Sequence, residues 1–573
     1  MASVRALLAL CLLPAGSAMI KRELLELSAR SSESTAARTR AQAWQARLAS
    51  LRGCSGLECM QQYVALEDDA YTWSDSGHVT KGTDASNGVG YTSYVLNMTS
   101  QHWLSPKETS ASIWWHPLVV VIPDNLEAQS SDWATLVVGG AMATNDLFKL
   151  SPPSATNLDV LASINMATRT KAPAATLLMV PNQDMVLPEV DGKRRSEDGI
   201  KAYTWMEARE HPDEPTWPIE MPSAKAVVRA MDTVTAFAET LQLPRGATSK
   251  YVVTGCSKRG MATYDVAAAD TVPGRVKAIM PCVVAWNTTA LATVGGPSFG
   301  AIPHALHDYL ESGFDRSFDD PSFEPVLDII DPMRWTTTSM YAGLPKFVLN
   351  AGNDDIFLPD STNQYWDHLP EPKTLLVAPN LPHQGSLGLD NFVPAAANFV
   401  RGILRDAALP QINWTLDKAA GTIAAYQVSG HTPVSVEQWT ASTCAGSGRR
   451  DFRQMTAESG ENCTRCGHED PSQLLLRKMA GVYAPPAICV VTAATAYAAT
   501  PVAESAPASG TWTAKIEAPG DGQWSSSLLL FTYAPLEDGL APFTISTEAL
   551  VYPDVYPFPS CTGVGCEYGG KIV

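Results

Sequence analysis

Between about residues 118 and 405, short apolar runs rich in Val, Ile and Leu alternate with segments of helical pattern. Continuous apolar runs of strand length predict strands that are buried on both faces, and strands alternating with helices predict a mainly parallel sheet. This feature restricts the chain to an α/β fold. The predicted strands are residues 118–122, 133–138, 174–180, 250–254, 276–284, 346–350 and 374–378, and the main helices are 158–168, 224–241 and 261–269.

After about residue 405 the pattern changes to short strands separated by turn residues. Such a series predicts an antiparallel β-sandwich. The 573 residues also exceed the roughly 250–300 at which one hydrophobic core stops growing, so two domains are expected. We predict an α/β domain over residues 65–404 and a β-sandwich-like domain over residues 405–573.

The first 64 residues precede the predicted α/β domain. Residues 1–18 carry one arginine, an apolar run and a small-residue cleavage pattern, which predict a signal peptide and a secreted protein. Residues 19–64 predict a polar helical lead-in with little apolar surface to bury. No other apolar run approaches the roughly 20 residues of a membrane span, and the net charge of −18 argues against a nucleic-acid partner.

The placement of the cysteines fits an oxidising compartment. Cys54 and Cys59 lie close together, as do Cys561 and Cys566, so each pair can close a small loop. A further cluster lies in the C-terminal third of the chain and consists of Cys444, Cys463, Cys466 and Cys489. Cys463 and Cys466 with His468 also form a zinc-ligand pattern, although secretion favours disulfides, and their connectivity stays open. Glycosylation sequons begin at Asn97, Asn287, Asn413 and Asn462.

The stretch from Tyr251 to Gly260 predicts a nucleophile elbow. An apolar β-branched run leads into Gly255-Cys256-Ser257-Lys258-Arg259-Gly260, and a small-residue helical segment follows. In such an elbow a strained turn between a strand and a helix presents a serine hydroxyl. The second glycine falls three residues after the serine instead of two, so the motif is a variant and requires partner residues.

The partners follow in the chain order Ser, acid, His of an α/β-hydrolase. Asp354 lies in the turn after the strand 346–350 and is the predicted acid, with Asp355 and Asp360 as competitors. His383 follows the next strand and is the predicted base. Histidine would accept the proton of Ser257, and the carboxylate would orient the imidazole.

Backbone amides near the elbow predict an oxyanion hole. One donor would be the N–H of Lys258, and the second would come from the glycine turn after strand 133–138, at Gly140 or Ala141. Arg259 is a candidate for substrate binding, or alternatively forms a buried structural ion pair. Cys256 and Cys282 end two neighbouring predicted strands, so they form either a disulfide or two buried small side chains.

In these and several other segments the chain resembles the PhoPQ-activated pathogenicity-related proteins, a family that includes autocrine proliferation repressors. The resemblance covers about residues 65–560 and rests on the segments 114–116, 180–183, 195–198, 203–205, 221–225, 229–232, 255–260, 354–360, 379–383 and 450–453. It implies an α/β-hydrolase fold with an all-β tail and Ser257, Asp354 and His383 as the triad. It also implies that Gly260 is the family's own variant, and it leaves the substrate open. The extra cysteines between 444 and 489 and an Ala/Pro/Ser-rich insertion near residue 500 depart from the pattern.

The sequence therefore predicts a secreted serine hydrolase that cleaves an ester or peptide bond through an acyl-enzyme. This chemistry requires no cofactor and no metal ion. The alternative is a secreted signalling protein of the proliferation-repressor type, in which the fold serves as a scaffold that recognises a cell-surface partner.

Overall fold

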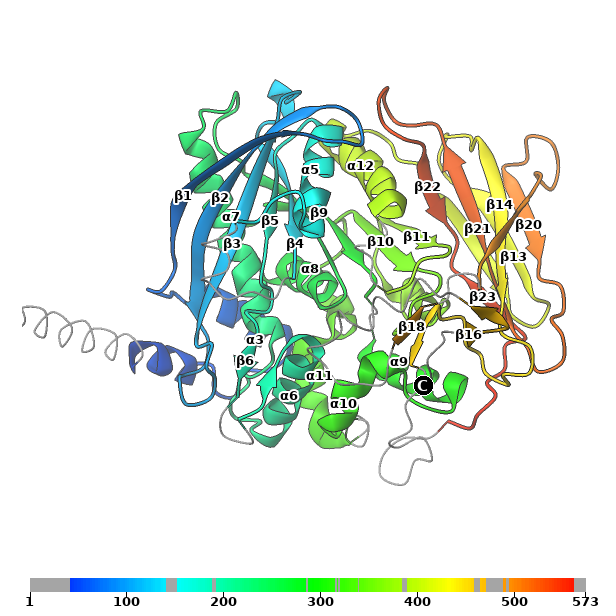
Figure 1. Ribbon diagram of the computed structural model, residues 1–573, viewed down its shortest axis with the longest axis horizontal. Coiled ribbons are helices and arrows are strands. Elements are labelled where there is room, and N and C mark those ends of the chain that lie inside the picture. The colour runs from blue at the N-terminus through cyan, green and yellow to red at the C-terminus, as the bar shows by residue number, and fades with distance from the viewer. Residues whose placement is uncertain are drawn as a thin grey trace, which may run out of the picture.

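The structure of the protein is a computed structural model (Figure 1). It describes residues 42–140, 152–187, 192–284, 287–314, 317, 320–338, 340–383, 389–457, 464–469, 488–490 and 494–560. The predicted signal peptide, Ala141 and the cysteine pair 561 and 566 lie outside these residues.

A nine-stranded sheet forms the centre of the molecule, in the order β1-β2-β3-β5-β4-β8-β9-β10-β11. The strands β1 to β3 are antiparallel, and β5 to β11 along that order run parallel to one another. The strands are β1 (Thr72–Thr83), β2 (Gly90–His102), β3 (Ile113–Pro123), β4 (Trp133–Val138), β5 (Ala174–Leu177), β8 (Lys250–Cys256), β9 (Val276–Cys282), β10 (Lys346–Ala351) and β11 (Lys373–Ala378). The predicted α/β-hydrolase fold with a mainly parallel sheet is confirmed.

Helices cover both faces of the sheet and divide its side chains between two hydrophobic clusters. In β8, Val253 belongs to the cluster with α3 (Gly56–Ala65), α7 (Glu220–Thr240) and α8 (Lys258–Ala269). The adjacent Val252 belongs to the cluster with α5 (Leu158–Thr170) and α12 (Leu389–Arg405). Successive side chains of a strand point to opposite faces, so a strand buried on both sides is apolar throughout. This explains the continuous apolar runs of the sequence.

The C-terminal β-region, residues 406–560, contains two packed antiparallel sheets, as the strand pattern predicts. One sheet has the order β12-β13-β20, the other has the order β19-β14-β21-β22, and β23 also pairs with β21. Trp512 and Phe531 pack edge to face between the sheets, with ring centroids 5.2 Å apart. The strands of these two sheets are β12 (Ile412–Asp417), β13 (Thr422–Gln427), β14 (Ser435–Ser442), β19 (Ala498–Pro501), β20 (Thr511–Lys515), β21 (Ser525–Tyr533), β22 (Phe543–Ser546) and β23 (Leu550–Tyr552).

This β-region packs against the end of the central sheet formed by β10 and β11, opposite the end formed by β1 (Figure 1). Phe347 of β10 contacts both Phe399 of α12 and Phe543 of β22. The amide of Val377 donates to Ser546 Oγ over 2.8 Å. Because Phe347, Phe399 and Phe543 belong to one hydrophobic cluster, the β-region shares a core with the α/β part.

The segment before the sheet differs from the sequence-based expectation. Trp44, Leu48 and Leu51 are buried, although little apolar surface was expected there. Their spacing of four and three residues aligns them on one side of a helical segment over residues 42–49 and its following turn. Trp44 packs edge to face on Tyr63, and the ammonium of Lys225 lies over its ring. These three side chains join the buried apolar residues of α3 in one hydrophobic cluster, so the segment packs on the α/β part.

Three disulfides lie within the described residues, and they join Cys54 to Cys59, Cys256 to Cys282 and Cys444 to Cys466. The close pair at 54 and 59 is as predicted, and the alternative of two buried thiols at 256 and 282 is excluded. The zinc interpretation of Cys463, Cys466 and His468 is wrong, because the Cys466 sulfur is bonded to Cys444.

The glycosylation sequons differ in how exposed their asparagines are. Asn413 is exposed on β12, whereas Asn97 and Asn287 are half-buried, and Asn462 lies outside the described residues. Within the part of the chain that the structure describes, no helix is both long and apolar enough to cross a membrane.

Candidate active site

Ser257 sits in a sharp turn between β8 and α8. Its backbone has φ 59° and ψ −127°, a conformation that a residue with a side chain adopts only under strain. Hydrogen bonds on both sides hold it there. The Ser257 amide donates to Cys282 O over 2.8 Å, and Ser257 O accepts from the Met261 amide as the helix begins. This geometry is that of the predicted nucleophile elbow.

The two glycines of the motif are required by close backbone contacts. A Cβ atom at Gly255 would lie 2.7 Å from Arg259 O, and one at Gly260 would lie 2.9 Å from Cys282 O. Both distances are shorter than real Cβ contacts. The glycine three residues after Ser257 therefore allows α8 to pack directly against β9. The Cys256–Cys282 disulfide joins the ends of β8 and β9 at this level.

The structure brings the three predicted triad residues together. His383 Nε2 lies 2.9 Å from Ser257 Oγ, and His383 Nδ1 lies 2.9 Å from Asp354 Oδ2 and 3.0 Å from Oδ1. Asp354 Oδ1 also accepts the amides of Ile356 and Phe357, which fixes the carboxylate in the turn. Each of the three side chains is thus within hydrogen-bond distance of the next.

The charges around His383 favour its protonated form. Burial alone would lower the pKa of His383, but the adjacent Asp354 carboxylate outweighs it, and the pKa is raised. Asp355 accepts the backbone amide of His383 at 3.0 Å instead of its ring. Burial raises the pKa of Asp355. Of the competitors, Asp355 therefore supports the loop, and Asp360 forms an ion pair with Arg450.

The predicted oxyanion donors differ in whether their backbone N–H groups already have a hydrogen-bond acceptor. Lys258 is the first residue of α8, and the amides of a first helical turn have no acceptor within their helix. The amide of Gly140 instead donates to Asp159 Oδ2 over 3.1 Å. Ala141 lies outside the described residues. Lys258 N is therefore the donor that this geometry supports, and the assignment of the second donor stays a prediction.

Two acidic residues that the sequence did not assign a role neutralise the cations after the serine. Lys258 Nζ lies 2.8 Å from Glu197 and 3.0 Å from Asp198, and Arg259 Nη2 lies 2.6 Å from Glu197. Burial would raise the pKa of Glu197, but Arg259 and Lys258 hold it well below its usual range. The Arg259 guanidinium thus forms an ion pair, which is the alternative to substrate binding, and both of its partners are half-buried. In the sequence, the only indication that Glu197 and Asp198 matter is that segment 195–198 is one of those that carry the family resemblance.

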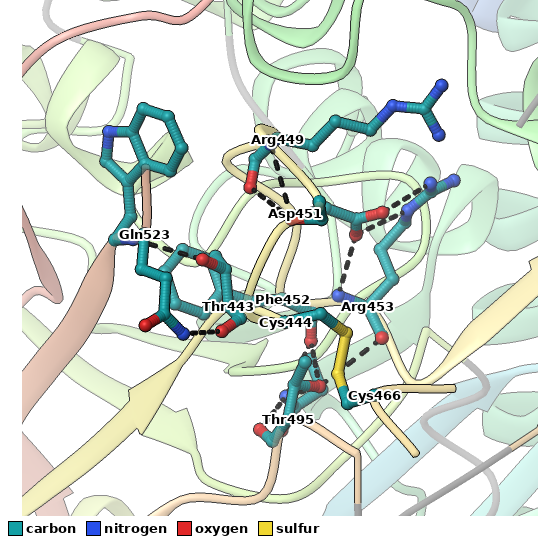
Figure 2. Close-up of a disulfide and its surroundings, with 12 residues drawn as sticks. Thr443, Cys444, Arg449, Asp451, Phe452, Arg453, Cys466, Thr495 and Gln523 are labelled. Atoms are coloured by element: carbon teal, nitrogen blue, oxygen red, sulfur yellow. Dashed lines mark hydrogen bonds and ion pairs between the residues drawn. A yellow bond between two sulfur atoms is a disulfide. The ribbon is translucent and has the colours of Figure 1, made fainter. Parts of the chain in front are cut away.

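The C-terminal β-region holds the turn that carries Asp354. The side-chain amide of Asn353, which is fully buried, donates to Phe452 O over 2.7 Å and to Thr495 O over 2.9 Å. Thr495 Oγ1 donates to Phe452 O over 2.7 Å (Figure 2). The segment that contains Phe452 follows Cys444, whose disulfide to Cys466 is drawn in the same view.

The same region also holds the loop that carries His383. Asn380 Nδ2 donates to Tyr497 O over 3.0 Å, and the Tyr497 amide donates back to Asn380 Oδ1 over 2.6 Å. Tyr497 Oη donates to Gly352 O, next to Asn353. The acid turn and the histidine loop therefore share one support. Sequence reasoning missed it, because no local pattern links residues 353 and 380 with residues 452–497.

A pocket of about 510 Å³ opens at Ser257 and His383. Its polar lining includes Asp198, His304, His307 and Asp355, and the remainder is mainly apolar. A volume of this size is typical of a small-molecule site. One group of described residues away from this lining, Asp68, Asp69 and His102, brings metal-ligand atoms together. The Asp68 carboxylate is already bonded to the amide and ring of His102, so we assign no metal site there.

Comparison with known proteins identifies a family model and a relative in Dictyostelium that match this chain. Residues 60–453 match the family model described as PhoPQ-activated pathogenicity-related protein. Autocrine proliferation repressor protein A from Dictyostelium discoideum is 28% identical over 425 residues, which are 72% of this chain and 80% of that protein.

Among solved structures, acetyl xylan esterase from Paenibacillus sp. R4 matches with a TM-score of 0.38 and 14% identity, over 61% of this chain and 98% of that one. Acetyl xylan esterase 1 from Thermoanaerobacterium sp. JW/SL YS485 matches with a TM-score of 0.35 and 12% identity, over 60% and 97%.

Proposed function

The chain belongs to the PhoPQ-activated pathogenicity-related protein family, and we propose that it is a secreted serine hydrolase that cleaves ester or peptide bonds. The observation that carries the proposal is the hydrogen-bonded row from Ser257 Oγ through His383 to Asp354. A hydroxyl, an imidazole and a buried carboxylate in this order form the arrangement that activates a serine.

In the first half of the reaction, His383 Nε2 accepts the hydroxyl proton as Ser257 Oγ attacks the carbonyl carbon of the substrate. The carbonyl π electrons move onto its oxygen, which accepts a hydrogen bond from Lys258 N. When the tetrahedral intermediate collapses, the bond to the leaving group breaks. The leaving group takes the proton from His383 Nε2 and departs as an alcohol or amine, and the acyl group stays on Ser257.

In the second half, water replaces the leaving group. His383 Nε2 accepts one proton of the water as its oxygen attacks the acyl carbon. The proton then returns to Ser257 Oγ, and the acid is released. Asp354 keeps Nδ1 protonated throughout and stabilises the imidazolium that forms in each half.

Hydrolysis of activated esters tests this proposal. The mature chain should hydrolyse p-nitrophenyl esters, and Ser257→Ala should lose at least about 10³-fold in kcat. The control is Ser249→Ala, which changes an exposed serine outside the pocket and should retain the wild-type rate. Equal rates for wild type and Ser257→Ala, or no turnover of any ester or peptide by the wild type, would overturn the proposal.

The disulfides support the secreted part of the proposal, since such bonds persist in oxidising compartments. Expression of the full chain with its first 18 residues should release protein into the medium, and deletion of those residues should retain it in the cell. Retention of both forms would contradict secretion.

A second candidate function comes from the relative in Dictyostelium, whose name describes a proliferation repressor. In that case a surface of this chain would bind a cell-surface partner, and the triad would be dispensable. Ser257→Ala separates the two candidates. A variant that represses growth as the wild type does would favour signalling, and a variant that does not would tie the biological effect to hydrolysis.

A further inference from the structure

One side of α5 faces the pocket that opens at Ser257. Leu158, Ala162 and Met166 all line it, at a spacing of four residues. This spacing places them along a single helix face, over about 12 Å at 1.5 Å per residue. Leu158, at the start of the row, is 41% exposed. The row therefore runs from the open end of the pocket into the core.

Two other elements complete this apolar part of the pocket. On α12, Phe392, Val393 and Ala396 line it, again from one helix face. The helices α5 and α12 lie in contact over the same face of the sheet (Figure 1). The sheet contributes a row of residues that pair directly across three parallel strands, and this row consists of Val137, Thr254 and Met280.

The polar groups in this apolar part already have partners. Thr254 Oγ1 donates to Met280 O over 2.7 Å, so its hydroxyl is committed to the sheet. Asp159 Oδ2 accepts the Gly140 amide over 3.1 Å. A polar ligand group would find few free partners here. An apolar group would replace water against Leu, Val, Met and Phe side chains, which is favourable.

The position of His383 decides which part of a substrate enters. The leaving-group oxygen must lie beside His383 Nε2 to receive its proton. Asp355 lies at that end of the pocket, because its carboxylate accepts the backbone amide of His383. The substituent on the other side of the carbonyl carbon is the acyl group, and it would lie in the apolar part of the pocket.

We propose that the row of apolar residues between α5 and α12 is an acyl-binding pocket, and that the preferred substrates are esters of extended hydrophobic acids. This inference rests on the proposed hydrolase function and adds its substrate class. A chain that fits along about 12 Å of helix should gain roughly threefold in kcat/KM for each methylene buried.

A series of p-nitrophenyl esters with acyl chains from acetyl to octanoyl tests the proposal with one constant leaving group. We expect kcat/KM to rise at least about 30-fold from acetyl to octanoyl. Ala162→Phe and Ala396→Phe place rings in the pocket from opposite helices and should each lower the octanoyl-to-acetyl ratio at least about tenfold. The control is Leu161→Phe, which changes a half-buried α5 residue outside the lining and should keep the wild-type ratio.

Labelling of Ser257 by a short-chain fluorophosphonate reports separately on folding and on the triad. A flat or falling chain-length series in a protein that is labelled would overturn the acyl pocket and leave the hydrolase function standing. A gain with acetate esters of longer alcohols, and none with longer acyl groups, would also overturn the acyl pocket alone. An unlabelled wild type that hydrolyses neither esters nor peptides would overturn both proposals. A ratio that persists in both pocket variants, while they are still labelled, would overturn the pocket alone.

Discussion

The two halves of the candidate triad are held in place by different parts of the chain. The elbow that carries Ser257 is formed by one continuous segment and fixed by its neighbour β9, through Cys282 O and a disulfide. The acid turn and the histidine loop are instead held by the C-terminal β-region. Asn353 reaches partners 99 and 142 residues away, and Asn380 one 117 residues away. The nucleophile is thus supported locally, whereas the acid and base depend on another part of the chain.

The largest effect is expected at the acid. In Asp354→Asn the amide favours the wrong imidazole tautomer, and kcat should fall about 10⁴-fold, as for a buried triad aspartate in general. Asp355→Asn is the matched control, because that carboxylate accepts the backbone amide of His383 instead of bonding its ring, and a loss of about tenfold is expected. Steady-state kinetics on one ester measure both. Equal losses, or a larger loss for Asp355→Asn, would show that the acid is assigned wrongly.

A substitution in the elbow should change the stability of the protein. Gly260→Ala forces a methyl group against Cys282 O and should lower the free energy of unfolding by about 1–3 kcal/mol. Gly295→Ala in α9 (Thr288–Phe299) meets no atom within 4 Å and should be neutral or stabilising by up to about 1 kcal/mol. Denaturant titration measures both changes. If Gly260→Ala were as stable as the wild type, close packing of α8 on β9 would not explain the motif.

This contrast also explains what the sequence predicts and what it does not. Continuous apolar strands, the elbow and the order Ser257, Asp354, His383 could be predicted because each depends on a short segment with its own pattern. Asn353 and Tyr497 carry no such pattern, since their function arises only when segments distant in the sequence meet. Glu197 is similar, because the role of its half-buried carboxylate arises only once Lys258 and Arg259 lie beside it.

The support from the β-region should be visible in catalysis. Asn353→Ala removes the hydrogen bonds to Phe452 O and Thr495 O. Phe452 O keeps the Thr495 hydroxyl as a donor, and the loss of the two buried bonds should cost about 1–3 kcal/mol of stability. We expect kcat to fall about tenfold as the acid turn loosens, with little change in KM. Tyr497→Phe removes only the bonds of one hydroxyl and is the milder comparison, at about 1 kcal/mol. A stability loss without any change in kcat would show that the β-region does not position the triad.

The smallest effect is a shift in pH dependence. His383 must be neutral to accept the serine proton, so kcat should be lost as pH falls through its pKa. Burial lowers the pKa of His383, but the Asp354 carboxylate raises it by more. The acidic limb of the pH–kcat profile should therefore lie above about 6.5, the usual pKa of a histidine. In Asp354→Asn the raising charge is absent, and the limb should move to lower pH, while Gly260→Ala should leave it in place. A limb that does not move in Asp354→Asn would separate the carboxylate from the base.

The central claim is that Ser257 is an activated nucleophile. Mass spectrometry of the intact, fluorophosphonate-treated protein, followed by peptide mapping, tests it directly because no substrate need be known. We expect one adduct on Ser257, slower labelling in Asp354→Asn, and no adduct in Ser257→Ala. Absence of any adduct on the folded wild-type protein, or an adduct on another residue that persists in Ser257→Ala, would contradict it.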